Sequence, residues 1–393
     1  MSQSSLPDQG QTTAPASLRQ VWLRWLAGLA VGALFTWWSA KSWPLDALLG
    51  GTLALGDDVH GHLALQSLNA RGGQVWAVDL SAICIYAIFL TIIHWLRVLR
   101  WKPLLEPYAS VPLRALNRVG AVGFMAVFLL PLRLGELTRP LMLARQGAGH
   151  KPVRFTAGLG TIALERVLDG LLVTALLFVV LQEIHPLTLA RFPQVQVGAW
   201  ASLGIFSVAL GGLVATVVAR DFTLNWTRRI IGAASTGLAE KVIGLVTAFV
   251  DGLAVLKSPW HVVQFVGLTV LYWGVNGLGV WLFAGGFGIQ MPVVAAYAMM
   301  SCVVVGMMIP NAPANAGSFW TFLLLPAGLY GVDDQSPRTI AFALGLWLAQ
   351  TVQVAVFGIW GSWADTRAFS RQAQLDARAS RQAADTVAAT AMP

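Results

Sequence analysis

Long apolar runs recur along this chain and are separated by short polar segments. An α-helix needs about 20 residues to cross the roughly 30 Å hydrocarbon core of a bilayer, and most of the runs have about this length. The pattern therefore predicts an all-α polytopic membrane protein. Six full spans are expected, at residues 21–38, 75–99, 155–181, 197–219, 262–284 and 339–363.

Shorter apolar runs predict a second kind of element. Residues 119–131 would form about 20 Å of helix, which is too short to cross the bilayer. Pro131 and Gly135 then break the helix, so we expect a re-entrant hairpin that opens to the cytoplasm. A second broken hairpin is predicted from residues 293–309 and 318–330, and it opens to the outside. Two hairpins of opposite direction are typical of an inverted repeat with its site near the midplane.

Basic residues decide the predicted orientation. The segment after the second span is rich in positive charge and is expected to be a cytoplasmic loop. The second span ends in Arg97, Arg100 and Lys102, and Arg114 and Arg118 follow shortly after. With six full spans, both termini are then expected to lie in the cytoplasm.

The remaining segments are predicted to flank or cap the spans. Residues 1–19 read as a disordered cytoplasmic tail, residues 20–365 as one transmembrane domain, and residues 366–393 as a second cytoplasmic tail. Residues 238–256 have an apolar helical stripe and are predicted to lie at the inner interface.

One polar stretch, residues 41–74, is predicted to be a solvated loop. It contains Asp57, Asp58, His60 and His62, whose spacing could also bind a metal. No further ligands are placed to complete such a site, so the loop reading is favoured and no metal is expected.

Composition agrees with the membrane class and narrows the partners. The 393 residues are 56% hydrophobic and only 11% charged, whereas soluble proteins contain about 25% charged residues. The net charge of +8 is carried by short loops and the tail, which indicates anionic lipid headgroups rather than nucleic acid as partners. The sequence contains no nucleotide-binding loop, catalytic triad order or metal box, so no cofactor is expected.

Charges inside the predicted membrane region are the candidate functional residues, because burying them there is costly. In the first hairpin Arg133, Glu136 and Arg139 repeat at i,i+3. In the third span Glu165 and Asp169 share one helical face, and Arg166 can pair with Asp169. The predicted cluster consists of Arg133, Glu136, Arg139, Glu165, Arg166 and Asp169, whose charges sum to zero.

Two readings of this cluster remain open. The charges could simply pin the hairpin to the third span through ion pairs. Alternatively, one of the three arginines could leave its carboxylate and bind a lipid phosphate, a role for which arginine is well suited.

Other polar residues of the spans give weaker signals. Asn276, Gln350 and Gln353 are expected to form interhelical hydrogen bonds rather than to line a path. Asp79 and His94 are expected to reach the membrane interface.

The charged motifs resemble a known family. Pro131-x-Arg133-x-Gly135-Glu136-x-x-Arg139-Pro140, followed by Glu165-Arg166-x-x-Asp169, is similar to the lysylphosphatidylglycerol synthase transmembrane, flippase-like family. The resemblance covers about residues 20–363. It implies an integral inner-membrane protein that moves a lipid between leaflets, and it lends weight to the six charged residues.

The second hairpin matches the family only in part. Its Pro313, Asn315 and Gly317 stand where members carry a Pro-Gly-Gly-Leu-Gly-x-x-Glu motif, and Trp320 stands where the acid would be. No segment resembles the aminoacyl-transferase domain of the multiple peptide resistance factors. We therefore expect that this chain does not make lysylphosphatidylglycerol by itself.

The function expected from the sequence is a lipid flippase or transporter that moves a phospholipid or polyprenyl phosphate. One alternative is a membrane enzyme that uses Glu136 and Glu165 as an acid–base pair. Another is a non-catalytic scaffold for a lipid-synthesis enzyme, and a homo-oligomer is compatible with each. The sequence favours transport over enzymatic activity.

Overall fold

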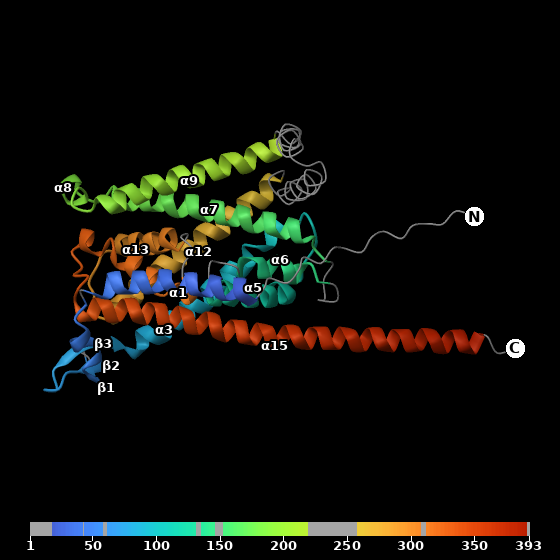
Figure 1. Ribbon diagram of the computed structural model, residues 1–393, viewed down its shortest axis with the longest axis horizontal. Coiled ribbons are helices and arrows are strands. Elements are labelled where there is room, and N and C mark those ends of the chain that lie inside the picture. The colour runs from blue at the N-terminus through green and yellow to red at the C-terminus, as the bar shows by residue number, and fades with distance from the viewer. Residues whose placement is uncertain are drawn as a thin grey trace.

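The core of the fold is a bundle of long helices that run roughly side by side (Figure 1). The computed structural model describes residues 18–41, 43–57, 61–130, 135–145, 152–218, 258–307 and 312–390. In these ranges six helices have 20 residues or more, and they follow the order of the six predicted spans. They are α1 (Leu18–Ala40), α3 (Leu80–Leu99), α7 (Phe155–Leu181), α9 (Pro193–Val218), α12 (Pro259–Gly286) and α15 (Pro337–Thr390).

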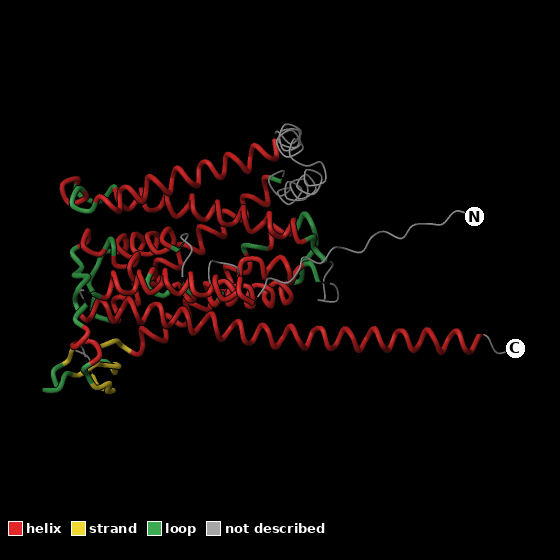
Figure 2. The backbone as a smooth tube through the Cα atoms, in the orientation of Figure 1, coloured by secondary structure: helices red, strands yellow, loops and turns green. Residues whose placement is uncertain are grey.

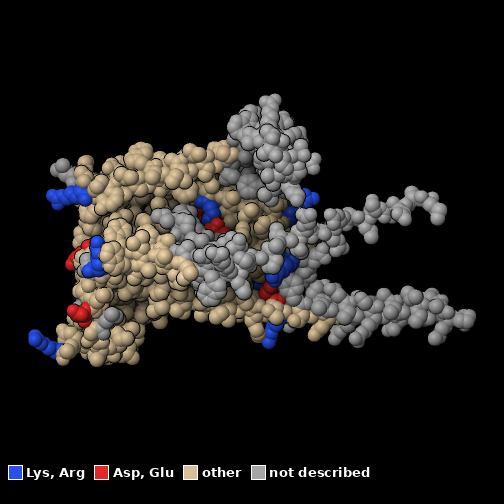
Figure 3. Space-filling model, in the orientation of Figure 1, with Lys and Arg blue, Asp and Glu red and all other residues tan. Residues whose placement is uncertain are grey.

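Helix length and apolar surface mark a multi-pass membrane protein. Within the described ranges, four segments are long and apolar enough to cross a bilayer: Leu80–Leu105, Pro193–Gly212, Pro259–Gly286 and Pro337–Ala368. Helix α7 is also long enough, but three charged residues interrupt it. Figure 3 shows described charged residues at the two ends, and a mostly uncharged surface between them with one small charged group near its middle. Large apolar side chains such as Ile88, Val208 and Ile359 are exposed on the long helices, as expected for contact with lipid.

The first predicted hairpin does fold back on itself. Helix α5 (Leu113–Leu129) begins earlier than predicted, and its 17 residues extend about 25 Å, still less than a full span. Gly135 lies against the backbone of Ala126, and Gly123 lies against Arg139 in α6 (Thr138–Leu143). The returning chain therefore runs antiparallel to α5. Pro131 and Arg133 lie outside the described residues, as does the predicted helix at 238–256.

The second predicted hairpin also folds back but is more broken. Helix α13 (Val293–Gly306) has 14 residues, and α14 (Ser318–Leu324) has only seven. Two 3-10 turns, η3 (Pro313–Asn315) and η4 (Ala327–Tyr330), flank α14. The Phe322 side chain lies against Gly306, so α14 returns along α13. The continuous second limb predicted for residues 318–330 is wrong, because Pro326 interrupts it.

The predicted polar loop is wrong in the structure. Residues 45–79 form a short helix α2 (Leu45–Leu49) and a three-stranded antiparallel sheet at one end of the bundle (Figure 2). Its strands, in the spatial order β1-β2-β3, are β1 (Thr52–Asp57), β2 (Leu63–Leu68) and β3 (Gln74–Asp79). Leu55 pairs with Leu65 across β1 and β2, and Ala64 is buried on the opposite face of the sheet.

The third strand shortens the predicted second span, which begins at Leu80 instead of residue 75. Asp79 is the N-cap of α3: its Oδ1 accepts from the Ser81 backbone N–H at 2.7 Å, and it lies 3.5 Å from His62. In the described ranges no group of three potential metal ligands exists, and Asp58 and His60 lie outside these ranges.

Asp79→Ala removes this N-cap and is expected to destabilise the protein by about 1 kcal/mol. Thermal unfolding in detergent, followed by tryptophan fluorescence, measures the change. The matched control is Asp46→Ala, because Asp46 is exposed in the first turn of α2 and caps nothing. An equal loss in both variants would contradict the capping role.

Arg100, predicted for the basic loop after the second span, lies in the core instead. Arg100, Trp101 and Leu104 are almost completely buried, and residues Lys102–Leu105 form the short helix α4. The apolar residues between the charges draw this segment into the core. His94 does not reach the interface either: it is buried, bonds Asn117 at 2.8 Å and stacks on Phe357 at 4.2 Å.

Close helix packing surrounds the two hairpins. Helix α15 packs along α5, and α12 packs along α3. Small residues allow the approach, since Gly358 lies against Met125 and Gly286 against Ala82. Helix α1 packs against the second hairpin, where Gly32 lies against Ala312. The remaining short helix, α8 (Pro186–Leu189), joins α7 to α9.

Candidate functional site

The centre of the charged cluster is Glu165, which is fully buried in the middle of α7. Arg139 donates from Nη1 to Oε2 at 2.8 Å, and Arg100 donates from Nη2 to Oε1 at 3.0 Å. Arg166 also donates to Oε1. Three arginines, from the C-terminal end of α3, from α6 and from α7, thus converge on one carboxylate and join the first hairpin to two long helices.

Asp169 forms the second half of the cluster, one helical turn further along α7. Both terminal nitrogens of Arg100 donate to it, the longer contact being 2.9 Å. The Trp273 indole N–H donates to Oδ1 at 3.2 Å, and Arg166 lies 3.3 Å from Oδ2. The predicted shared face of Glu165 and Asp169 and the predicted Arg166–Asp169 pair are both present.

Arg100 is the residue that the sequence interpretation missed. It bridges Glu165 and Asp169, and its guanidinium lies 4.4 Å from the centre of the Tyr272 ring. Cation–π contact of this kind adds stabilisation where water is excluded. The signal was present in the sequence as Trp101, Leu104 and Leu105 directly after the arginine, because such apolar residues favour burial over an exposed loop.

The first hairpin supplies the remaining described charges. Arg139 is fully buried, with its guanidinium 4.9 Å from the Trp101 ring and 5.2 Å from the Phe124 ring. Glu136 is partly buried and interacts electrostatically with Arg166. Five of the six predicted residues are therefore brought together, while Arg133 lies outside the described residues.

The six predicted residues sum to zero charge, but the structure adds Arg97 and Arg100 to the same region. Arg97, Arg100, Arg139 and Arg166 lie in one region with three carboxylates, Glu136, Glu165 and Asp169. In the described part of the chain the site therefore carries one excess positive charge, which favours an anionic ligand.

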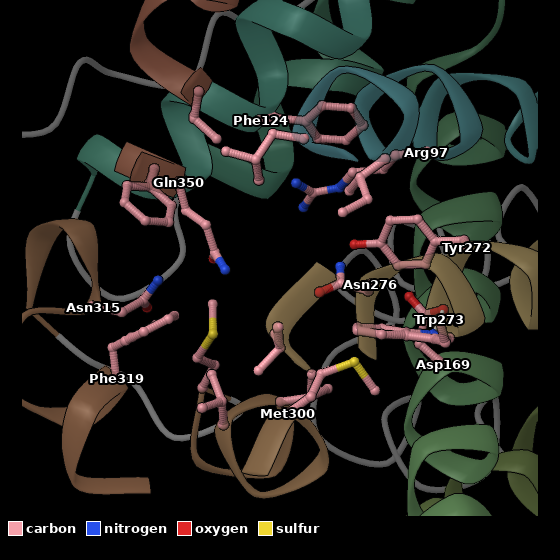
Figure 4. A pocket seen from close by; sticks show the side chains of 18 of the residues that line it. Arg97, Phe124, Asp169, Tyr272, Trp273, Asn276, Met300, Asn315, Phe319 and Gln350 are labelled. Atoms are coloured by element: carbon pink, nitrogen blue, oxygen red, sulfur yellow. Dashed lines mark hydrogen bonds between the residues drawn. The ribbon is translucent and has the colours of Figure 1, made fainter. Parts of the chain in front are cut away.

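A cavity of about 140 Å³ lies between the cluster and the second hairpin. On one side it is lined by Arg97, Arg100, Arg166 and Asp169, and on the other by residues that include Asn315 and Phe319. Figure 4 shows Arg97, Asn276 and Gln350 directed toward this space. Of the predicted site residues, Arg166, Asp169 and Asn315 line the cavity, whereas Glu165 and Arg139 lie behind its wall.

Arg97 differs from the other arginines of the site. Its guanidinium lies 3.8 Å from the centre of the Phe124 ring, and its buried Nε has no hydrogen-bond partner. Among the described residues, no carboxylate lies within ion-pair distance of it, and its charge is repelled by Arg166, Arg139 and Arg100. A cation that faces a cavity without a protein counter-ion can accept one from a ligand.

The second hairpin has a strained backbone beside the cavity. Ala314 and Asn315 adopt left-handed conformations, with φ of 56° and 52°, and strain of this kind typically costs about 1–3 kcal/mol. The Trp347 indole N–H donates to the Ala314 carbonyl at 2.8 Å and holds the turn that Pro313 begins. Gly317, at φ 86°, has no room for a side chain, because a Cβ would lie 2.6 Å from the Gly32 carbonyl oxygen.

Trp320 fills the position where the resemblance led us to note a missing acid. It is buried, with ring-centre distances of 6.1 Å to Trp43 and 5.5 Å to Trp347. Among the described residues, Asp169 is the one carboxylate that lines the cavity, and it is already bonded to Arg100 and Trp273.

Among the described residues, one of the three amide side chains forms the predicted interhelical hydrogen bond. Gln350 donates to the Tyr86 hydroxyl at 3.0 Å and so joins α15 to α3. Asn276, Gln350 and Gln353 also line the cavity.

Comparison with known families decides the relationship of this chain. The family described as lysylphosphatidylglycerol synthase TM region matches residues 25–358. The chain belongs to this family. Comparison with curated proteins gave no match, and comparison with solved structures gave none either.

In this member of the lysylphosphatidylglycerol synthase TM family, the motif residues and the cavity occupy neighbouring places. The resemblance drew attention to Arg139, Glu165, Arg166 and Asp169, which form the described ion-pair network. It did not point to Arg97 or Arg100, because neither residue lies in the two charged motifs that carry the resemblance. Family membership and the apolar helices together establish a multi-pass membrane protein with a role in lipid handling.

Proposed function

We propose that this family member moves a phosphate-bearing lipid, a phospholipid or a polyprenyl phosphate, between the two leaflets of a bacterial inner membrane. The observation that supports this proposal is the positively charged cavity between two broken hairpins. Non-helical backbone at membrane depth is tolerated where it lines such a cavity, and transporters place their sites at interrupted helices. Both termini are proposed to be cytoplasmic, with the sheet outside.

The size of the cavity fits this role. Pockets for drug-sized ligands have volumes of roughly 300–1,000 Å³, so a cavity of about 140 Å³ can hold a headgroup but not a whole lipid. The acyl or prenyl chains would remain in the surrounding bilayer. Alternating exposure of the cavity to the two sides, by movement of the re-entrant hairpins, would then carry the headgroup across.

The two readings of the charged cluster apply to different residues. Arg139 and Glu165 do not line the cavity, and their ion pair joins α6 to α7, which supports the pinning role. Arg166 lines the cavity and is partly exposed, so it is the member of the predicted set that we propose to approach the phosphate. Arg133 and Glu136 stay predictions as binding residues.

Val303→Phe tests the proposal by filling the cavity, because Val303 is buried in α13 and lines it. We expect the wild-type protein to move fluorescent phosphatidylglycerol or polyprenyl phosphate across the membrane of reconstituted liposomes, and the variant to lose most of this movement. Overpacking costs about 1–3 kcal/mol, so both proteins are first checked for monodisperse elution.

Val270→Phe is the matched control, since Val270 is exposed on the outer face of α12. This control is expected to keep wild-type transport. Absence of movement of either lipid with folded wild-type protein would overturn the transport proposal. Equal movement in all three proteins would place the path elsewhere.

The alternative of group transfer through Glu136 and Glu165 gains no support from the geometry. Glu165 does not line the cavity, and both of its oxygens accept from arginines.

A further inference from the structure

Three amides and one arginine on separate helices face the cavity with hydrogen-bonding capacity left over. Arg97 comes from α3, Asn276 from α12, and Gln350 and Gln353 from α15. In the described structure, Asn276 and Gln353 have no hydrogen-bond partner, and Gln350 uses only its amide nitrogen, toward Tyr86. The three amides are partly buried, and the Nε of Arg97 is buried without a partner, so the polar groups that face the cavity are open to a polar ligand.

The chemistry of these groups restricts that ligand. Arg97 offers a positive charge and a planar set of donors, which suits a phosphate oxygen pair. Amides both donate and accept, so they match hydroxyl groups, which do the same. A cationic headgroup would need a free carboxylate, but the one described carboxylate of the lining, Asp169, is bonded to Arg100 and Trp273.

Electrostatic repulsion among the arginines of the site further restricts the ligand. The described site already has more arginines than carboxylates, and the charges of Arg100, Arg139 and Arg166 repel that of Arg97. A bound phosphate would offset the repulsion among these arginines. A headgroup that carries an ammonium group beside the phosphate would bring another positive charge close to them. Trp320, packed between Trp43 and Trp347, supplies no negative charge from the second hairpin.

We propose that the cavity selects a lipid whose headgroup is a phosphodiester of a neutral, hydroxyl-bearing group, and that Arg97 binds the phosphate while Asn276, Gln350 and Gln353 bind the hydroxyls. The inference rests on the proposed function in taking the cavity as a headgroup site. It assigns the selective contact to Arg97, which lies outside the family motif, and it predicts weaker binding of cationic and zwitterionic headgroups.

Lipid binding, separate from transport, tests this selection. The full-length protein in detergent is mixed with equal amounts of phosphatidylglycerol, lysylphosphatidylglycerol and phosphatidylethanolamine, and bound lipid is measured by native mass spectrometry. We expect at least about tenfold preference for phosphatidylglycerol, equivalent to about 1.4 kcal/mol. Equal binding of the three lipids, or preference for the lysyl lipid, would overturn the proposal.

Substitution then assigns the contacts. Arg97→Gln is expected to weaken phosphatidylglycerol binding about tenfold, and Arg97→Lys to recover most of it, because the charge is kept. The double variant N276L/Q353L is expected to bind phosphatidylglycerol no better than phosphatidic acid, which lacks the glycerol hydroxyls. Arg114→Gln is the matched control, since Arg114 is exposed and away from the cavity lining.

The outcomes separate this inference from the proposed function. If Arg97→Gln binds phosphatidylglycerol as strongly as the wild type does, the inference is overturned even if lipid transport is observed. The same holds if the double variant keeps its preference for phosphatidylglycerol over phosphatidic acid. If binding is selective and depends on Arg97 but no lipid is transported in liposomes, the inference stands and the proposed flippase function is contradicted. Saturable binding of free glycerol phosphate that displaces phosphatidylglycerol would show that the site takes a soluble ester and would overturn the lipid assignment.

Discussion

Glu165→Leu is expected to cause the largest loss of stability of any single carboxylate change in the described structure. The substitution leaves Arg139 without its ion pair and takes one partner each from Arg100 and Arg166, in a region that is almost fully buried. Removing one partner of a buried ion pair typically costs about 3–5 kcal/mol, because an uncompensated charge stays inside. The fraction of monodisperse protein after stepwise heating in detergent measures this loss.

Glu183→Leu provides the comparison for this experiment. Glu183 lies in the exposed turn after α7, so the same chemical change is expected to alter stability by less than about 0.5 kcal/mol. If the two leucine variants lose folded protein at the same temperature, the three arginines have found other partners, and Glu165 is not the centre of the network.

Gly135→Ala is expected to open the first hairpin and to abolish lipid transport. A Cβ at residue 135 would overlap the backbone of Ala126 and Val127, and neither segment can yield by a simple rotamer change. The returning chain carries Arg139, so displacing it would also lengthen the 2.8 Å contact with Glu165. Trypsin cleavage at arginines of this region, compared between variant and wild type in liposomes, reports the opening.

Gly198→Ala is the matched control, because Gly198 lies in helix α9 with open space around its Cα. Here the same substitution is expected to be neutral or stabilising by up to about 1 kcal/mol, since alanine is the better helix former. Wild-type transport by Gly135→Ala would show that the hairpin tolerates displacement and would contradict its close packing as a requirement.

Hydropathy was sufficient to predict the elements that are defined by the length of an apolar run and by the residues that interrupt it. The six long helices follow the predicted spans, and the turn near Gly135 follows from a run too short to cross the membrane. The charged residues of α7 could be paired in advance, because helical spacing alone places Glu165 and Asp169 on one face. These features depend on local sequence, so the sequence shows them.

Features that depend on tertiary packing could not be predicted in the same way. Arg97 and Arg100 end an apolar run and fit the positive-inside rule, and only the packing of α4, α7 and α12 around them places them in the core. The sheet was missed because Asp57 and His62 gave its segment a polar character. Pairing of Leu55 with Leu65 is a contact between strands, which a loop reading does not consider.

Helix α15 links the cavity wall to a point far from it. It is continuous from Pro337 to Thr390, and Gln350 and Gln353 lie in its first third, at the cavity. The part from Gln350 to Thr390 is about 60 Å long, twice the roughly 30 Å hydrocarbon core. A tilt of this helix that accompanies headgroup entry would displace its C-terminal end much further than the residues at the cavity. A probe attached there would therefore report the state of the cavity from outside the bilayer.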